Sequence, residues 1–421
     1  MGVQDNAERC VIVGAGPAGL SAAAGAAQLR PLVLEGGPNV GRRSQADSES
    51  IVQGVGGAGL YSDGKFSFWP SATALWRLDP SLLLPAYRWF ANLVSSRSGI
   101  EAPPLPADLL GGVAGVDVGA CAARHKNYPS FYASPQERAL LVADLASAAR
   151  VEADAMVEAV EPGNASWTVT VRTAGRRRSV TAEAVIVAGG RFGGLLTAQA
   201  LPAAHRTLRL EVGVRVEQPA GDFFLRDDPR LDPKIIWTDD SERVQWRTFC
   251  CCREGVVAQT KSHGVLSVSG RADCAPSGRS NVGFNVRLLD PVDVAREWPA
   301  MLERLRLASA AAEAPLATLL PGAMPNPGAD ALRAILGPLL SARLAQGLAL
   351  LVRDFPGGHL ESALVTGPTV EGVGMYLDHD DRLATPLRGL WVAGDAAGTF
   401  RGLTAALVSG HVAGSAAVAA R

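Results

Sequence analysis

The sequence predicts an α/β protein with a central parallel sheet and a small β-meander, into which an antiparallel sheet and several helices are inserted. Three observations predict this class. Short apolar strands run into glycine turns and then helices near both ends of the chain. Alternating strands and turns fill residues 206–290, and a helical pattern follows over 291–354. The 421 residues, 48% of them hydrophobic, suffice for more than one domain.

The first motif is a strand, a glycine turn and a helix. Residues 9–13 form an apolar, β-branched run, which GAGPAG (residues 14–19) and a helical stretch over 20–29 follow. In the G-x-G-x-x-G pattern the first glycine permits the turn, the second lets the backbone approach a pyrophosphate, and the third lets the helix pack closely. We therefore predict a Rossmann-type dinucleotide site, whose contacts are Gly14, Gly16, Pro17, Ala18 and Gly19.

The second predicted strand, residues 31–34, ends in an acid. Glu35 stands about 20 residues beyond the first glycine, which is the spacing of the acid that binds an adenosine ribose. Gly36 completes the E-G-G ending of this strand. Arg42 and Arg43 follow, either as cations near the adenine-side phosphate or as a solvated surface.

A second glycine cluster, GVGGAGLYSDGK, occupies residues 54–65 and is too rich in glycine for a helix or strand interior. Successive N–H groups in such a loop can form an anion-binding nest. The alternative is an exposed surface loop. The predicted contacts are the backbone of Gly56, Gly57, Ala58 and Gly59 and the side chains of Ser62, Asp63 and Lys65.

The C-terminal region repeats the pattern of strand, glycine and helix. Residues 390–393 are strand-like, Gly394 and Asp395 follow, and residues 402–419 are helical. This helix consists mostly of Ala, Gly and Ser, which bury little apolar area, so we expect a tightly packed core helix and not a membrane span. Another buried strand, within 181–190, ends in Ala188 and Gly189 and follows a β-meander that starts with the strand containing Val157. We count these three residues among the cofactor contacts.

These motifs resemble those of bacterial FAD-dependent dehydrogenases. The segments are GVGGAGLYSDGK, TFCCCREG, SHGVLSVSGR with SGRSNVGFNV, and AGDAAGTFRGL. The resemblance extends to two-dinucleotide-binding-domain flavoproteins, including geranylgeranyl-reductase-like and aromatic-hydroxylase-like enzymes. It implies FAD as cofactor, with Asp395 on a ribityl hydroxyl and Gly402, Leu403 and Thr404 at the flavin. The proline that those reductases and hydroxylases usually have before this turn is absent here, and Arg401 precedes Gly402 instead.

The middle of the chain is expected to form a substrate domain. Strands are predicted at 208–217, 234–238, 244–251, 256–260 and 265–269. Residues 79–110 are expected to form two short helices, and a capping box at Ser134 starts a helix that ends near 149. The expected domains are a discontinuous FAD-binding domain (1–75, 125–205 and 357–421), a helical insertion (76–124) and a substrate or cap domain (206–356).

Two residues are candidates for catalysis. Arg401 lies in the C-terminal motif and could hold a substrate anion or stabilise charge on reduced flavin. His263, in a turn after a strand, could act as a general base or be an ordinary hydrogen-bonded histidine. Cys250, Cys251 and Cys252 lack the spacing of a zinc site, so we expect no metal and interpret them as buried hydrophobic residues, with a redox relay as the alternative.

Composition restricts the partners. Forty Lys and Arg balance 41 Asp and Glu, which argues against nucleic acid, and six cysteines fit a reducing cytoplasm. The leading hypothesis is an FAD-dependent dehydrogenase or oxidase that transfers a hydride between a small-molecule metabolite and FAD, with transient NAD(P)H or dioxygen as a further partner. The alternatives are an NAD(P)H-dependent flavin monooxygenase, a protein with a structural flavin, and a redox-neutral cyclase. Neither the substrate nor the oligomeric state follows from the sequence.

Overall fold

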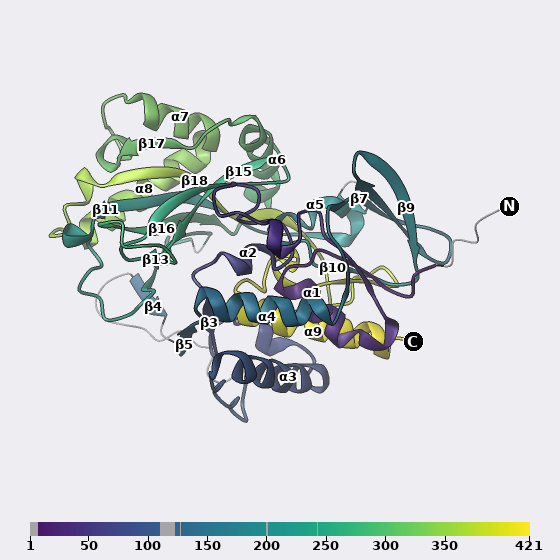
Figure 1. Ribbon diagram of the computed structural model, residues 1–421. Helices are drawn as coiled ribbons and strands as arrows, with labels where there is room; N and C mark the ends of the chain where they lie inside the picture. Colours follow the sequence, from purple (N-terminus) through teal and green to yellow (C-terminus); the bar gives the residue numbers. More distant parts are fainter. Residues whose placement is uncertain (1–6, 110–122, 127, 199–200, 242) are drawn as a thin grey trace. The chain divides into compact units, whose positions relative to one another are not determined.

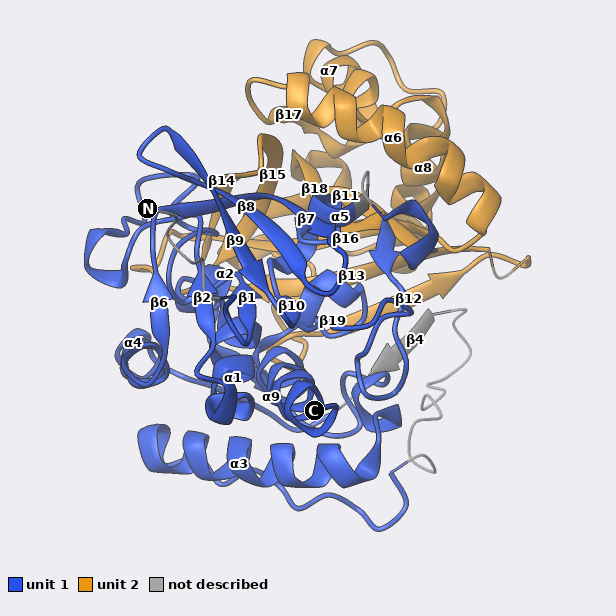
Figure 2. Cartoon of the chain, turned by 90° about the vertical axis from the view of Figure 1, so that its right-hand side faces the viewer, with its two compact units in different colours: residues 1–113, 128–206, 375–421 blue, residues 114–127, 207–374 orange. Residues whose placement is uncertain are grey.

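The computed structural model describes residues 7–109, 123–126, 128–198, 201–241 and 243–421 (Figure 1). The chain divides into two compact units: unit 1 comprises residues 1–113, 128–206 and 375–421, and unit 2 comprises residues 114–127 and 207–374 (Figure 2). The domain boundaries expected from the sequence stay a prediction. Leu110, at the end of the expected pair of helices, and Cys121 lie outside the described residues.

Unit 1 is built on a five-stranded parallel sheet in the order β19-β10-β1-β2-β6. Its strands are β1 (Val11–Val13), β2 (Leu32–Leu34), β6 (Arg150–Glu152), β10 (Val185–Val187) and β19 (Leu390–Val392). Branched and aromatic apolar residues dominate them, and β1, β10 and β19 are fully buried, as expected for a parallel sheet that is covered on both faces. The predicted central parallel sheet is confirmed.

Helices cover one face of this sheet, and the antiparallel meander lies on the other (Figure 2). The helices of unit 1 are α1 (Pro17–Gly25), α2 (Gly57–Leu60), α3 (Pro80–Ser98), α4 (Pro135–Ser147), α5 (Leu195–Ala198) and α9 (Leu403–Ala419). The meander consists of β7 (Ala155–Pro162), β8 (Trp167–Thr173) and β9 (Arg176–Ala182), and β3 (Lys65–Ser67) pairs with β5 (Ser130–Tyr132).

The C-terminal helix α9 packs directly against α1. A Cβ atom on Gly410 would lie 2.1 Å from the carbonyl oxygen of Ala18, and one on Gly414 would lie 2.2 Å from that of Ala22. The glycines therefore allow the two helix backbones to touch. This confirms the expectation of a tightly packed core helix, and none of the helices in the described part of the chain is long and apolar enough to span a membrane.

Unit 2 is built on a seven-stranded sheet in the order β17-β18-β11-β16-β13-β12-β4. Its strands are β4 (Ala123–Lys126), β11 (His205–Pro219), β12 (Lys234–Thr238), β13 (Val244–Cys252), β16 (Arg279–Leu288), β17 (Ala312–Pro315) and β18 (Leu364–Leu377). A separate hairpin consists of β14 (Val256–Ser262) and β15 (Val265–Arg271). The inserted antiparallel sheet that the sequence predicts is thus present, with antiparallel pairing of β11 with β16 and of β13 with β16.

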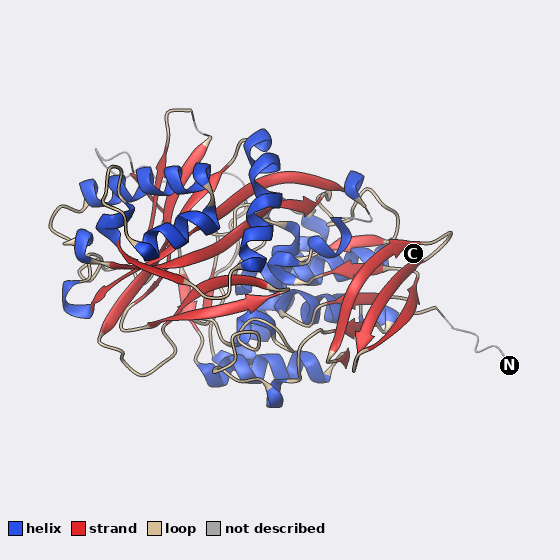
Figure 3. Ribbon diagram, turned by 90° about the horizontal axis from the view of Figure 1, so that it is seen from above, coloured by secondary structure: helices blue, strands red, loops and turns tan. Residues whose placement is uncertain are grey.

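The sheet of unit 2 has one apolar and one polar face. Along β11, Val212 and Val214 alternate with Glu211 and Arg215, and both sets are buried. Three helices accompany the sheet: α6 (Pro291–Leu307), α7 (Pro327–Leu336) and α8 (Pro338–Asp354) (Figure 3). A Cβ atom on Gly347 of α8 would lie 2.1 Å from the ring of Trp246 of β13, so this helix packs on the apolar face.

Several local predictions can be compared with the structure. The capping box is present: Ser134 caps α4, and the Glu137 carboxylate accepts a bond from the Ser134 N–H. The expectation of two short helices over 79–110 is wrong, because α3 is one helix that continues through Pro85. The sequence analysis also missed β16 and β18, which are central to the sheet of unit 2.

Candidate dinucleotide-binding site

The two outer glycines of GAGPAG are required by the packing of the protein itself. Gly14 has φ +100°, and a Cβ atom there would lie 2.7 Å from the carbonyl oxygen of Ala188. A Cβ atom on Gly19 would lie only 1.7 Å from the carbonyl oxygen of Gly14. Any other residue at these positions would force the turn, the helix α1 and the end of β10 apart.

The middle glycine is different. Gly16 has φ −73° and ψ −179°, which any residue can adopt, and its Cβ atom would meet only the Cα atom of Gly57, at 3.8 Å. Packing within the protein therefore does not require glycine at this position. Gly16 is also the N-cap of α1, whose first turn carries no acidic side chain. A helix N-terminus with an open approach to its backbone suits an anion such as a pyrophosphate.

Glu35 connects the end of β2 to both glycine-rich loops. Its buried carboxylate accepts three backbone bonds: Oε2 from Ala15 N at 2.8 Å, and Oε1 from Gly37 N at 2.9 Å and Gly54 N at 3.0 Å. A carboxylate has about four acceptor positions, so one stays available for a hydroxyl group. Gly36 beside it is constrained by Met156, whose terminal methyl would lie 2.6 Å from a Cβ atom.

The two arginines after β2 contact the chain itself. Arg42 forms an exposed ion pair with Asp154. Arg43 is buried, its Nε and Nη1 donate to the carbonyl oxygens of Ser50 (3.0 Å) and Val55 (2.9 Å), and its guanidinium lies 4.8 Å from the ring centre of Tyr61. Burial lowers the pKa of Arg43. These contacts show Arg43 bracing the loop over 50–55, so a role toward a phosphate stays a prediction.

The loop over 54–65 lies against the first glycine turn. Gly56 N donates to Ala15 O at 2.8 Å, and a Cβ atom on Gly57 would lie 2.9 Å from the Cα atom of Gly16. A Cβ atom on Gly59, which follows Ala58 in α2, would lie 2.7 Å from the ring of Pro17 and 2.9 Å from a methyl group of Leu403. Three segments that are far apart in the sequence therefore meet in unit 1.

The polar residues of this loop make local contacts. Ser62 Oγ donates to Gly59 O at 3.0 Å and accepts from Gly64 N at 3.1 Å. The Asp63 carboxylate accepts from Lys65 N at 3.2 Å, and the Lys65 ammonium lies 5.2 Å from the ring centre of Tyr128. These contacts shape the end of the loop, and the ligand-binding roles of the three side chains stay predictions.

The C-terminal motif brings together two predicted residues and one that the sequence analysis missed. Asp395 follows Gly394, where a Cβ atom would lie 2.6 Å from the Cβ atom of Ala18. The Asp395 carboxylate accepts from Arg401, with Nη2 at 3.0 Å and Nε at 3.1 Å from Oδ2. Arg191 lies 3.7 Å from the same oxygen. Arg191 belongs to the run GGRFGG (residues 189–194), so its place directly after a buried strand was the available signal.

The turn before α9 and the first turn of this helix contain buried hydroxyl groups that make no hydrogen bond within the described part of the chain. These are the Oγ1 atoms of Thr399 and Thr404. Gly402, with φ +96°, is the N-cap of α9, and no acidic side chain occupies the first turn of this helix. Unused hydroxyls beside a helix N-terminus and an arginine pair are suited to a ligand that has carbonyl and hydroxyl groups.

Of the remaining predicted contacts, Val157 and Ala188 are buried and Gly189 is partly exposed. Val157 is in β7 of the meander, and Ala188 N donates to Val13 O at 2.9 Å at the end of β10. Gly189 follows, and a Cβ atom there would lie 3.1 Å from Gly193 Cα. Contact with a ligand stays a prediction for each of these residues.

The other candidate catalytic residue, His263, lies in unit 2. His263 has φ +52° in the turn between β14 and β15, and its Nδ1 lies 3.0 Å from Ser262 Oγ. Arg271 pairs with Asp273 at 3.2 Å, and Arg279 pairs with Glu217 at 2.5 Å, so both are structural ion pairs. A catalytic role of His263 stays a prediction.

Unit 2 also contains a charged cluster on the polar face of its sheet. The fully buried carboxylate of Glu211 pairs with Arg209 at 3.0 Å, Arg247 at 2.9 Å and Arg287 at 3.0 Å. Burial lowers the pKa of Arg287 to about 9, although Glu211 opposes the shift. The sequence analysis missed this cluster because its residues come from β11, β13 and β16, the last of which it did not recognise as a strand.

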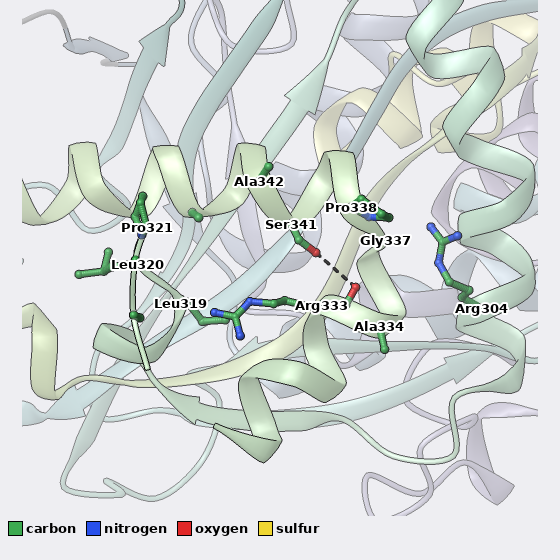
Figure 4. Close-up of a pocket in the computed structure, with 13 residues that line it drawn as sticks. Arg304, Leu319, Leu320, Pro321, Arg333, Ala334, Gly337, Pro338, Ser341 and Ala342 are labelled. Carbon is green, nitrogen blue, oxygen red and sulfur yellow. Dashed lines mark hydrogen bonds between the residues drawn. The ribbon is translucent and has the colours of Figure 1, made fainter. Parts of the chain in front are cut away.

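A hollow of about 630 Å³ lies among α6, α7 and α8 of unit 2 (Figure 4). Arg304 and Arg333 line it, but both donate to backbone carbonyls, of Leu336 at 2.9 Å and Thr318 at 2.6 Å respectively. Ser341 is the other polar side chain in its lining, and its hydroxyl donates to Arg333 O at 3.3 Å. The lining has no carboxylate, histidine or cysteine, so this hollow lacks the groups of an acid–base or redox centre.

Comparison with known proteins finds similarity at the level of the fold. No protein-family model and no curated protein matches the sequence. Among solved structures, the chain is similar to a flavoprotein/dehydrogenase from Cytophaga hutchinsonii (13% identity, TM-score 0.39), covering 97% of this chain and 78% of that one. It is also similar to OxyS anhydrotetracycline hydroxylase from Streptomyces rimosus (16%, TM-score 0.38), covering 94% of this chain and 59% of that one.

A third similar structure is CtdE, solved in complex with FAD and a substrate, with 13% identity and a TM-score of 0.34. The match covers 95% of this chain and 78% of CtdE. Flavoproteins are thus found among the structures that resemble this chain, as its sequence motifs indicate. Likeness of this degree carries no inference about substrate or reaction, which depend on the residues of the chain itself.

Proposed function

We propose that unit 1 binds FAD non-covalently and that the protein is an FAD-dependent oxidoreductase, which transfers a hydride between a small-molecule metabolite and the flavin. The observation that carries this proposal is the steric difference among the three glycines of the first motif. Gly14 and Gly19 are glycine because the protein leaves no room for a side chain, whereas the space beside Gly16 is open. A pyrophosphate that approaches the backbone there would explain why this residue is glycine.

The surrounding residues fit the rest of such a ligand. Glu35 keeps one acceptor position for a ribose hydroxyl after its three backbone bonds. At the other end of the site, the orphaned hydroxyls of Thr399 and Thr404 and the carboxylate of Asp395 offer polar partners. The segments 14–19, 35–36, 54–65 and 394–404 contain no histidine or cysteine, which supports non-covalent binding.

The bound flavin would supply two-electron hydride chemistry that no side chain of the protein can perform. The protein would orient it and favour negative charge beside it. The N-terminus of α9 carries a partial positive charge, and Arg401 with Arg191 outweighs the single charge of Asp395. Arg401 would therefore either stabilise charge that develops on the reduced cofactor or hold an anionic substrate.

The test uses the purified full-length protein under anaerobic conditions. We expect a yellow protein whose flavin is released by acid precipitation and is identified as FAD by chromatography. Addition of candidate metabolites, and then of NADH or NADPH, should bleach the flavin absorbance in at least one case. Copurified NAD without flavin would refute the cofactor, and a coloured precipitate would refute non-covalent binding. A flavin that no metabolite or nicotinamide reduces, but that dithionite does, would refute the redox function.

A further inference from the structure

Two thiols in unit 2 lie unusually close together for residues of one strand. The Sγ atoms of Cys250 and Cys252 are 3.8 Å apart. In a regular strand, residues i and i+2 are roughly 6.6 Å apart along the chain. Here a bulge interrupts the pairing of β13 with β16 between Phe249 and Cys252, and Cys250 adopts φ +48°. The irregular backbone is what brings the two sulfur atoms together.

A buried cation lies beside this pair. Arg215 is only 1% exposed; its Nε donates to Asn281 Oδ1 at 2.9 Å, and its Nη2 donates to the carbonyl oxygen of Cys250 at 2.8 Å. Its guanidinium also lies 5.8 Å from the ring centre of Phe249. No carboxylate pairs with Arg215 among the residues that the structure describes. An uncompensated buried charge is costly, so an anion formed by a neighbouring group would be stabilised there.

The thiols are the acidic groups next to Arg215. Burial works against its positive charge, but Cys252 and Cys250 favour that charge and raise the pKa of Arg215 above its ordinary value. A thiol next to an arginine cation is more readily converted to its thiolate, which is the reactive form of a thiol. Cys250 is also partly exposed, whereas Cys251 and Cys252 are buried.

The neighbouring cysteines have different surroundings. The N–H of Cys251 donates to Asp232 Oδ1 at 3.1 Å, and burial raises the pKa of the Cys251 thiol to about 12. Cys274 Sγ donates to the carbonyl oxygen of Arg271 at 3.9 Å. Cys251 and Cys274 therefore serve as matched controls, one in the same strand and one in the same unit.

We propose that Cys250 and Cys252 form a reversible thiol modification site, which a low-molecular-weight disulfide oxidises to a Cys250–Cys252 bridge. The Cys250 thiolate attacks one sulfur of R–S–S–R, so that a mixed disulfide forms and RS⁻ leaves. The Cys252 thiolate then attacks the Cys250 sulfur, which closes the bridge and releases a second RS⁻. The two thiol protons pass to the two leaving groups, and two electrons reduce R–S–S–R to two RSH. This inference does not depend on the proposed function.

Closing the bridge requires the sulfur atoms to approach from 3.8 Å to a bond length of about 2.05 Å. Rotation of the two side chains with a small shift of the bulge would supply this displacement. The same bulge carries the carbonyl group that accepts from Arg215. Formation of the Cys250–Cys252 disulfide would therefore change the contact between β13 and Arg215.

The experiment treats the purified protein with oxidised glutathione, quenches it with acid, alkylates the remaining thiols and digests it with trypsin. Cleavage after Arg247 and Arg253 yields one peptide, residues 248–253, that contains all three cysteines of the strand. In a Cys251→Ser variant this peptide should lose two hydrogens and carry no alkyl group. Cys252→Ser should stop with one glutathionyl group on Cys250, and Cys274→Ser should react like the wild type.

A substitution of Arg215 tests whether its positive charge activates the thiols. Arg215→Gln should slow the first step about tenfold, since a rise of one unit in thiol pKa reduces the thiolate tenfold. If that variant does not fold, the cysteine variants still decide the proposal. The proposal is overturned if Cys250 and Cys252 of the folded Cys251→Ser variant both remain open to alkylation after oxidised glutathione, while the same variant unfolded in urea is oxidised. It is also overturned if the disulfide of the wild-type protein includes Cys251.

Discussion

Gly16→Ala separates a glycine that a ligand requires from one that the fold requires. In the FAD-free protein the new Cβ atom would contact only Gly57 Cα at 3.8 Å, and φ −73° is ordinary for alanine. Replacing glycine by alanine removes a preferred N-cap residue, which destabilises the folded protein. It also reduces the entropy of the unfolded chain, which stabilises the folded protein, so the two effects oppose each other. We therefore expect the unfolding free energy of the FAD-free protein to change by less than about 1 kcal/mol.

The effect on FAD should be much larger. The methyl group would stand between the backbone and the pyrophosphate and would remove charged hydrogen bonds from N–H groups, each contributing about 1.5–3 kcal/mol. A loss of about 3 kcal/mol corresponds to a dissociation constant roughly 100-fold higher. Flavin fluorescence titration of the FAD-free proteins measures this change directly.

Gly19→Ala is the matched control. Its Cβ atom would lie 1.7 Å from Gly14 O, a backbone atom that cannot move without opening the turn. We expect the FAD-free Gly19→Ala protein to lose about 3 kcal/mol or more of stability, measured by urea unfolding. The reasoning is refuted if Gly16→Ala destabilises the FAD-free protein as much as Gly19→Ala does, or if Gly16→Ala binds FAD with unchanged affinity.

Three further predictions concern the opposite end of the site and pH. Asp395→Ala should weaken FAD binding about tenfold to 100-fold in the same titration, for the loss of one charged hydrogen bond, whereas Asp395→Asn should weaken it less; equal losses would contradict a hydrogen-bonding role. Arg401→Ala should keep FAD bound but slow flavin reduction ~10²–10³-fold in rapid mixing, while Cys251→Ser stays near the wild-type rate; the reverse ranking would favour a thiol relay. Burial lowers the pKa of His411 to about 4, so the unfolded chain binds more protons between about pH 4 and 6.5 and stability falls as pH decreases through that window. Because the ring is partly exposed and stacks on Trp89, we expect a loss of about 1–2 kcal/mol that His411→Gln abolishes, and an unchanged slope in urea unfolding would contradict it.

The parallel sheet and the meander were predictable because their signals are local. The strands β1, β10 and β19 of unit 1 are short apolar runs that end at glycine-containing turns, and β8 (Trp167–Thr173) alternates buried and partly exposed residues. The expectation of two helices over 79–110 was wrong because α3 continues through Pro85, which lies near the start of the helix, so that only one turn has to accommodate it.

β16 was missed although its alternation is regular. Val282, Phe284 and Val286 face one side, and Asn281 and Asn285 face the other. Both sides are buried, because the polar face of the sheet is occupied by hydrogen-bonded side chains such as Thr369, whose hydroxyl lies 2.6 Å from Asn285 Oδ1. In a single sequence, buried polar residues of a strand look like the polar residues of a loop. The side chains that hydrogen-bond to them belong to distant strands, so nothing near them in the sequence indicates that they are buried.

The candidate site shows the same division between local and distant information. The glycine pattern and Glu35 can be recognised from their spacing in the sequence. The space beside Gly16, in contrast, depends on the loop over 54–65, in which the Cα atom of Gly57 is the atom that a Cβ atom on Gly16 would approach. Arg43 illustrates the converse case. Its four hydrogen bonds to the carbonyl oxygens of Ser50, Ile51 and Val55 hold a loop of the protein, and no sequence pattern distinguishes such an arginine from one that binds phosphate.

The Asp395–Arg401 pair finally limits how each residue can act on a bound flavin. Arg401 and Arg191 both approach Oδ2 of Asp395, and Oδ1 lies 3.2 Å from Arg401 Nη2. Each carboxylate oxygen has about two acceptor positions, so a flavin hydroxyl that bonds to Asp395 need not release Arg401. The three side chains together keep one positive charge, which would make the reduced, negatively charged flavin easier to form. Removing Arg401 should then lower the flavin reduction potential if it acts on the cofactor, and leave the potential unchanged if it acts only on substrate.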